Sequence, residues 1–274
     1  MKLKKKFKFS DSNQVWRIKI TDTDKLFVET RDTEKMNAYF HSYDLFSGKR
    51  NFSGHQMSEK FWLGIEAIKD DIVFFHRYAK PDMPGHRGIF AFDINTQKVL
   101  WEDETYSFLF LKDDLIYVYQ ERFEGRNYYT LNIQSGEVVE ELGKNSDEIN
   151  ELRDEAERSV DYSNYTFPEK HFGASGDDEV DSIITCEIEN IKIVGEVEFI
   201  NTKGLLLFNY HQAGTNRSYI NKLKVIELNK RKEIYSDILN KATNALAPDS
   251  FFIFKDLLIL LKEKKEILIF EIKS

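Results

Sequence analysis

The sequence predicts an all-β fold, a β-propeller of about five four-stranded blades, from three observations. A short phrase recurs along the chain, and the acid or amide positions of its copies are spaced by 49, 39, 95 and 44 residues. The segments between copies have the length and the apolar content of strands. Repeats of forty-odd residues built from short strands are typical of sheets stacked around a ring. All 274 residues (1–274) form a single domain in this interpretation.

The recurring phrase is an apolar residue, an acid or amide, a second apolar residue and a turn. Its copies are Tyr43–Lys49, Phe92–Lys98, Leu131–Glu137, Ile226–Lys232 and, at the end of the sequence, Phe270–Ser274. Asp and Asn favour turns because their side chains bond the backbone two residues further on. Between copies, an apolar strand, a turn of Asp, Lys or Gly and a strongly apolar strand follow one another. Each unit therefore predicts one blade.

In chain order, the units open with Trp16–Ile20, Phe61–Lys69, Tyr106–Lys112, Gly195–Ile200 and Phe251–Phe254. The last unit ends before its fourth strand, whereas the first is preceded by a spare strand at Lys5–Phe9. We expect Lys5–Phe9 to close the last blade, because the sheet would otherwise keep an unpaired edge. The alternative is that Lys5–Phe9 is a frayed tail.

The step of 95 residues allows either a sixth, degraded blade or an insertion. We favour an insertion over residues 143–182. Asn145 and Glu148 form a capping box, which predicts the start of a helix, and an apolar stripe follows at helical spacing. Beyond it, Ile183–Glu187 and Ile191–Phe199 alternate as two strands would.

The predicted insertion is acidic. Residues 144–181 contain 12 acidic and 4 basic residues, a net charge of −8 that equals the charge of the whole chain. One interpretation is a solvated acidic loop without a role. The other follows from propeller geometry, which places a connection between blades on the same face as the loops between second and third strands. Basic residues in those loops would draw the insertion across the central opening. The candidate ligand-binding residues on this face are Arg31, His86, Arg87, Arg122, Arg126, His211 and Arg217.

The segment FDINTQKVLW, with Asp93, Thr96, Lys98 and Trp101, resembles the repeats of PQQ-like and WD-type propellers. The resemblance covers most of the chain and implies the fold alone. The copies lack a regularly repeated Trp and the Gly-rich docking segments of quinoprotein dehydrogenases. Neither a cofactor nor a catalytic residue is therefore carried over from these families.

The sequence contains no nucleophile motif and no Gly-rich phosphate loop. Cys186 is the single cysteine, so no intramolecular disulfide is expected. The net charge of −8 argues against a nucleic-acid partner. The apolar runs are too short to span a membrane, and without a secretory signal we expect a cytoplasmic protein.

We therefore predict a non-catalytic binding or scaffold propeller that uses no cofactor and no metal. Its partner would be a protein or peptide, contacted through the loop face and the acidic insertion. The alternative is a small-molecule or anion-binding enzyme or sensor with a site at the mouth of the central channel. The sequence does not indicate an oligomeric state.

Overall fold

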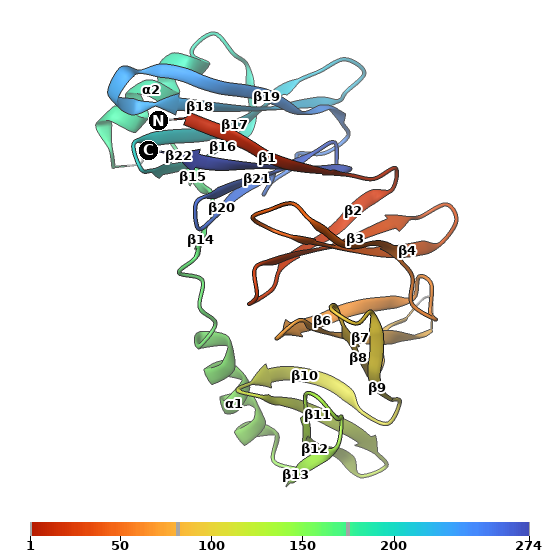
Figure 1. Ribbon diagram of the computed structural model, residues 1–274. Helices are drawn as coiled ribbons and strands as arrows, with labels where there is room; N and C mark the ends of the chain where they lie inside the picture. The colour runs from red at the N-terminus through yellow and green to blue at the C-terminus, as the bar shows by residue number, and fades with distance from the viewer. Residues whose placement is uncertain (1, 81–82, 174–175, 274) are drawn as a thin grey trace. The chain divides into compact units, whose positions relative to one another are not determined.

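A computed structural model describes residues 2–80, 83–173 and 176–273 of the chain (Figure 1). The chain forms five antiparallel sheets in two compact units. One unit is Val15–Asp161, and the other joins Met1–Gln14 to Tyr162–Ser274.

The unit of residues 15–161 contains three four-stranded sheets, each a meander in chain order. The first sheet consists of β2 (Gln14–Ile20), β3 (Lys25–Asp32), β4 (Asn37–Asp44) and β5 (Arg50–His55). The second consists of β6 (Leu63–Lys69), β7 (Ile72–Lys80), β8 (Met83–Asp93) and β9 (Lys98–Asp103). The third consists of β10 (Ser107–Lys112), β11 (Leu115–Arg122), β12 (Gly125–Asn132) and β13 (Val138–Gly143). Buried Phe side chains, Phe27 and Phe75 among them, fill the space between the first and second sheets, and Phe74 packs with Val118 between the second and third.

The other unit contains the fourth and fifth sheets. The fourth consists of β15 (Glu169–His171), β16 (Ile193–Thr202), β17 (Leu205–Ala213), β18 (Tyr219–Glu227) and β19 (Lys232–Thr243). The fifth has the order β1 (Lys2–Ser10), β22 (Glu266–Lys273), β21 (Leu257–Lys262), β20 (Phe251–Phe254) and β14 (Tyr165–Thr166). A 3₁₀ turn, η1 (Leu228–Lys230), precedes β19. Leu207, Leu223 and Leu258 belong to the core between these two sheets.

The predicted fold class is confirmed: the protein is all-β, with five blade-like antiparallel sheets. The N-terminal strand completes the last of them, as expected. β1 pairs with β22 in antiparallel register from Lys2 opposite Lys273 to Ser10 opposite Glu266. The last sheet thus gains the fourth strand that the C-terminal segment lacks.

The recurring phrase is explained by the turn that it builds. Asp44 Oδ1 accepts hydrogen bonds from the backbone N and the hydroxyl of Ser47, at 2.7 and 2.5 Å. Asn132 Oδ1 accepts in the same way from the backbone N of Ser135, at 3.0 Å. The apolar residue that follows the acid is buried, and its amide ties this turn to the turn between the first and second strands of the same sheet. The Leu45 amide, for example, donates to the Asp24 carbonyl at 3.0 Å.

Residues 143–182 contain α1 (Ser146–Arg158), the short strands β14 and β15, and the start of α2 (Asp178–Ile188). Asn145 caps α1 as predicted, since its side chain accepts from the amides of Asp147 and Glu148. The strand predicted at Ile183–Glu187 is wrong. The segment belongs instead to α2, which Asp177 caps. The amphipathic pattern of α2 lets the helix bury one face.

Each of the two helices packs on a sheet of its own unit. α1 packs on the third sheet through Ile149 and Ala156, and α2 packs on the fourth sheet through Val180 and Ile184. Apolar burial therefore places both helices against sheet faces, because exposed ion pairs contribute far less than buried side chains. Among the described residues, no helix combines the length and the apolar composition needed to cross a lipid bilayer.

Candidate functional site

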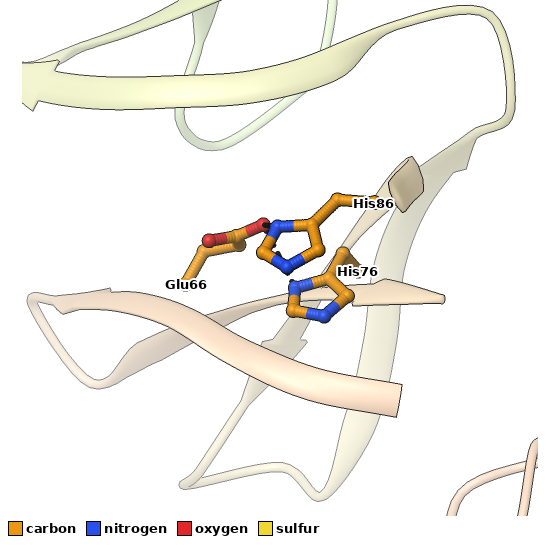
Figure 2. Close-up of side chains that lie close together, drawn as sticks. All are labelled: Glu66, His76 and His86. Atoms are coloured by element: carbon orange, nitrogen blue, oxygen red, sulfur yellow. Dashed lines mark hydrogen bonds and ion pairs between the residues drawn. The ribbon is translucent and has the colours of Figure 1, made fainter. Parts of the chain in front are cut away.

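The second sheet carries a carboxylate and two imidazoles that converge near one end of its strands (Figure 2). The register of β6 against β7 shifts between Ile65 and Ala67, so Glu66 is the extra residue on β6. The register of β7 against β8 shifts between Phe75 and Arg77, and there the extra residue lies on β8. A β-bulge re-aims a side chain out of the normal alternation of a strand. The two bulges lie on β6 and on β8, the strands on either side of β7, and Glu66, His76 and His86 converge beside them.

One oxygen of the Glu66 carboxylate lies at the edges of both imidazole rings, 2.7 Å from Nδ1 of each. His86 Nδ1 forms a hydrogen bond with Glu66 Oε1 at 2.7 Å. His76 Nδ1 is also 2.7 Å from this oxygen, but its direction is not that of a hydrogen bond. The two rings are stacked, with centroids 3.5 Å apart and planes inclined by 9°. One carboxylate oxygen therefore faces two ring nitrogens.

The cluster has an inner and an outer imidazole. The His76 side chain is 2% exposed and the His86 side chain is 41% exposed. Gly64 lies directly against the inner ring, since a Cβ added there would be 2.5 Å from His76 Cε1 and 2.7 Å from Nε2. Among the residues that the structure describes, none forms a hydrogen bond with His76 Nε2. A buried polar atom without a partner costs free energy, so the inner ring is held by packing and not by bonding.

These three side chains could hold a metal ion. Their ligand atoms all lie within 4.8 Å of one another. Imidazole nitrogen and carboxylate oxygen bind Zn²⁺ at about 2.0–2.2 Å, and three protein ligands leave one position open in a tetrahedral site. Ca²⁺ and Mg²⁺ prefer oxygen ligands. The donor set therefore favours Zn²⁺ or a related transition-metal ion.

Arg31, a predicted ligand-binding residue, is buried between the first and second sheets. Its Nε lies 2.6 Å from Glu29 Oε1, and its Nη2 donates to the Leu63 carbonyl at 2.7 Å. Burial raises the pKa of Glu29, although the charge of Arg31 opposes this shift. Arg31 thus compensates a buried carboxylate and ties β3 to the start of β6.

Arg87, Arg122 and Arg126 are exposed on the same unit. Arg87 Nη2 lies 3.9 Å from a Glu104 carboxylate oxygen. Arg126 places its guanidinium 4.2 Å from the centre of the Tyr119 ring. Of the predicted residues in the described part of the chain, His86 is the one that joins the Glu66–His76 cluster.

The last two predicted residues, His211 and Arg217, belong to the other unit. His211 is buried, and its Nε2 accepts a hydrogen bond from the Ala247 amide at 3.0 Å. Burial lowers the pKa of His211. Arg217 is exposed in the turn between β17 and β18, with a left-handed φ of 59°.

Glu66 and His76 are not among the candidate residues predicted from the sequence. A comparison of neighbouring repeats could have found both. When the Asp70-Asp71 turn is aligned with Asp113-Asp114, Glu66 falls on Leu109 and His76 falls on Tyr119. The signal is that this repeat has a carboxylate and an imidazole where the next repeat has an apolar and an aromatic residue.

Residues 20–101 match a family described as a domain of unknown function (DUF4905). That segment includes Glu66, His76 and His86. A search of curated proteins finds no match.

Among solved structures, the chain is similar to Hsv2 from Kluyveromyces lactis, with 12% identity, 96% of this chain and 76% of that chain covered, and a TM-score of 0.30. It is also similar to the WD40 domain of SCAP from fission yeast, with 6% identity, 97% of each chain covered and a TM-score of 0.39. Similarities this weak identify neither a ligand nor a partner.

Proposed function

We propose that the protein is a non-catalytic binding module that holds a transition-metal ion, Zn²⁺ by preference, through Glu66, His76 and His86. The observation that carries the proposal is the convergence of two imidazole nitrogens on one carboxylate oxygen, at 2.7 Å each. The inner imidazole is buried, and neither of its nitrogens makes a hydrogen bond within the described part of the chain. A bound metal ion would supply the missing partner and would balance the carboxylate charge.

The site is half closed, which suits reversible binding. His76 is supported by Gly64 from behind, while His86 gives an ion access from solvent. With three protein ligands, the fourth coordination position stays open to water or to an anion. The sequence also allows a small-molecule or anion-binding function. An anion bound to the metal ion at that open position would correspond to this alternative.

The test is a titration of metal-free protein with Zn²⁺ by calorimetry, together with Co²⁺ absorption spectra. We expect one ion per chain, and a loss of affinity of at least about 100-fold in His76→Gln and in His86→Gln, since outer-shell changes alone cost 10–100-fold. His55→Gln, a histidine of the first sheet that touches Phe52 and Phe92, is the matched control and should bind as the parent does. Folded parent protein that binds no Zn²⁺, or binding that survives both substitutions, would overturn the assignment.

We also propose that the protein binds a protein or peptide partner, and one exposed residue supports this proposal. Phe123, at the tip of the β11–β12 hairpin, is fully exposed between the charged residues Arg122 and Glu124. Aromatic and Arg side chains are enriched among the residues that dominate binding energy at interfaces. Phe123→Ser should weaken the capture of any partner that the parent protein retains, while Zn²⁺ binding should not change. Equal capture by both proteins would remove the hairpin from consideration.

A further inference from the structure

α2 covers one face of the fourth sheet only in part (Figure 1). Val180 and Ile184 of the helix pack on Phe208 of β17. Beyond the C-terminal end of α2, the same face is open and forms a groove of about 570 Å³. Ligand pockets commonly have volumes of about 300–1,000 Å³, so the groove is large enough for a small organic molecule.

The floor of the groove is one row of partners across three strands. Tyr210 of β17 lies opposite Lys222 of β18, and Lys222 lies opposite Ile238 of β19. Cross-strand partners point to the same face of a sheet. Ile191, which follows α2, adds an apolar side chain at the rim.

The two lysines of the groove differ in their surroundings. Lys224 Nζ is 2.5 Å from Glu187 Oε2 and 3.6 Å from Glu233 Oε2, so its charge is already balanced. In the described part of the chain, no hydrogen bond or ion pair engages the ammonium group of Lys222. One half-buried positive charge in the groove thus lacks a counter-charge.

The Tyr210 hydroxyl is a second donor without a partner. The residue is 2% exposed, and none of the described residues accepts a hydrogen bond from its hydroxyl. Burial raises the pKa of Tyr210, so the hydroxyl stays protonated at neutral pH. Tyr210 lines the groove, so its hydroxyl can donate a hydrogen bond to a ligand there.

We propose that this groove binds a small carboxylate with an apolar body. The carboxylate accepts from Lys222 Nζ and from the Tyr210 hydroxyl, and the apolar part lies on Ile191 and Ile238. A charge-assisted hydrogen bond from an ammonium group is the strong contact of the pair. The proposal is independent of the metal site, because the groove residues all lie in the unit that contains residues 162–274.

The experiment measures octanoate binding to the full chain by calorimetry and by NMR of the ¹³C-labelled carboxyl group. Octan-1-ol has the same chain without the charge, and octyl phosphate tests the other anion. We expect saturable octanoate binding with a dissociation constant below about 1 mM. The alcohol should bind much more weakly. Lys222→Met should weaken octanoate binding by about tenfold or more, as expected for a lost hydrogen bond to a charged group, and Tyr210→Phe should weaken it less.

Lys192→Met removes an exposed lysine next to Ile191 and is the matched control, which should bind octanoate as the parent does. Thermal midpoints of the variants without ligand report whether they fold. Octanoate should raise the midpoint of the parent by more than that of Lys222→Met. Equal affinity for octanoate and octan-1-ol would reduce the groove to an apolar surface and overturn the proposal. Binding of octyl phosphate in preference to octanoate would overturn the choice of carboxylate.

Discussion

The second and third sheets build the same backbone feature and use it for different purposes. In both, the register of the first strand against the second slips by one residue, at Glu66 in the second sheet and at Leu109 in the third. His76 stacks on His86 at 3.5 Å in the second sheet, and in the third the Arg126 guanidinium lies 4.2 Å above Tyr119. Each of these two repeats thus contains a bulge and a stacked pair of side chains. The identity of the side chains determines whether the pair can bind an ion.

What covers each sheet accounts for the difference. α1 lies on the third sheet, where Leu109 and Tyr119 join the cluster around Ile149. The corresponding face of the second sheet is covered by the third sheet, and its end stays open at His86. A bulge residue beneath a helix must be apolar, because burying an unpaired carboxylate is expensive. At an accessible end, a carboxylate and imidazoles are tolerated and can bind an ion.

The largest effect is expected when the second sheet is given the residues of the third. The triple variant Glu66→Leu, His76→Tyr and His86→Arg should lose all measurable Zn²⁺ affinity, because no ligand remains. The reverse variant Leu109→Glu, Tyr119→His and Arg126→His should gain none while α1 covers the bulge. Calorimetry with circular dichroism checks both. Zn²⁺ binding by the first triple variant would break the comparison.

The next effect concerns the helix that makes the third sheet different. Ile149→Ala should destabilise the unit of residues 15–161 by about 2–4 kcal/mol, because a buried methylene-rich side chain leaves a cavity. Urea unfolding measures this change, and Zn²⁺ affinity at neutral pH should stay as in the parent. Val160, which is half exposed beyond α1, gives the control substitution Val160→Ala, expected to be nearly neutral. A large loss of metal affinity in Ile149→Ala would show that the two sheets are coupled.

A third prediction concerns the residue behind the inner ring. Gly64 lies opposite His76, and Ser107 lies opposite Tyr119 at the equivalent position. Gly64→Ala should cost about 1–3 kcal/mol as an overpacked core does, because the new Cβ would be 2.5 Å from His76 Cε1. Ser107→Ala should cost little, since a side chain is already present there. Combining Gly64→Ala with His76→Ala should recover most of the loss, and failure of that rescue in chemical denaturation would contradict the contact.

The smallest effect distinguishes the turns of the two sheets. Asp71 is buried and accepts hydrogen bonds from Thr21 at 2.9 Å and from Lys25, whereas Asp114 is exposed. Burial alone would raise the pKa of Asp71, but hydrogen bonds from Lys25, then from Thr23 and Thr21, outweigh it and hold the pKa below its usual range.

A carboxyl group with a lowered folded-state pKa stabilises the fold above its unfolded pKa of about 3.9, and this contribution is lost as pH falls through the folded value. Asp71→Asn should therefore cost about 1–2 kcal/mol near pH 7, and the difference from the parent should shrink below about pH 4. Asp114→Asn should change little at either pH. Unfolding curves at several pH values measure this difference in the free energy of unfolding. A destabilisation by Asp71→Asn that does not depend on pH would contradict the prediction.

The repeat made the fold predictable, because its chemistry is local. The Asp44 and Asn132 turns bond within a few residues, and buried partners such as Leu45 follow at once, so a single sequence displays the whole unit. The pairing of β1 with the last sheet could also be predicted by counting strands, because the last unit lacked a fourth strand and the N-terminal segment had a spare one.

The candidate metal site depends on features that a sequence does not display. A β-bulge shifts the strand register without a residue signature, so nothing placed Glu66 beside His76. α2 was misread as a strand because Ile183 and Ile184 suit either structure, and the decisive cap at Asp177 lies before them. Arg31 looked like a loop residue, although its partner Glu29 is two positions away on the same strand and both are buried.

The pairing of β1 with β22 has a consequence for biosynthesis. A ribosome releases residues 15–161 with every strand of their three sheets present, so that unit can fold while translation continues. Residues 2–10 are made before residues 15–161 but cannot pair until residues 266–273 have been made. Throughout that interval an unpaired strand is exposed, and neighbouring nascent chains on one messenger RNA can exchange it, which makes slow translation of the C-terminal region a route to swapped dimers.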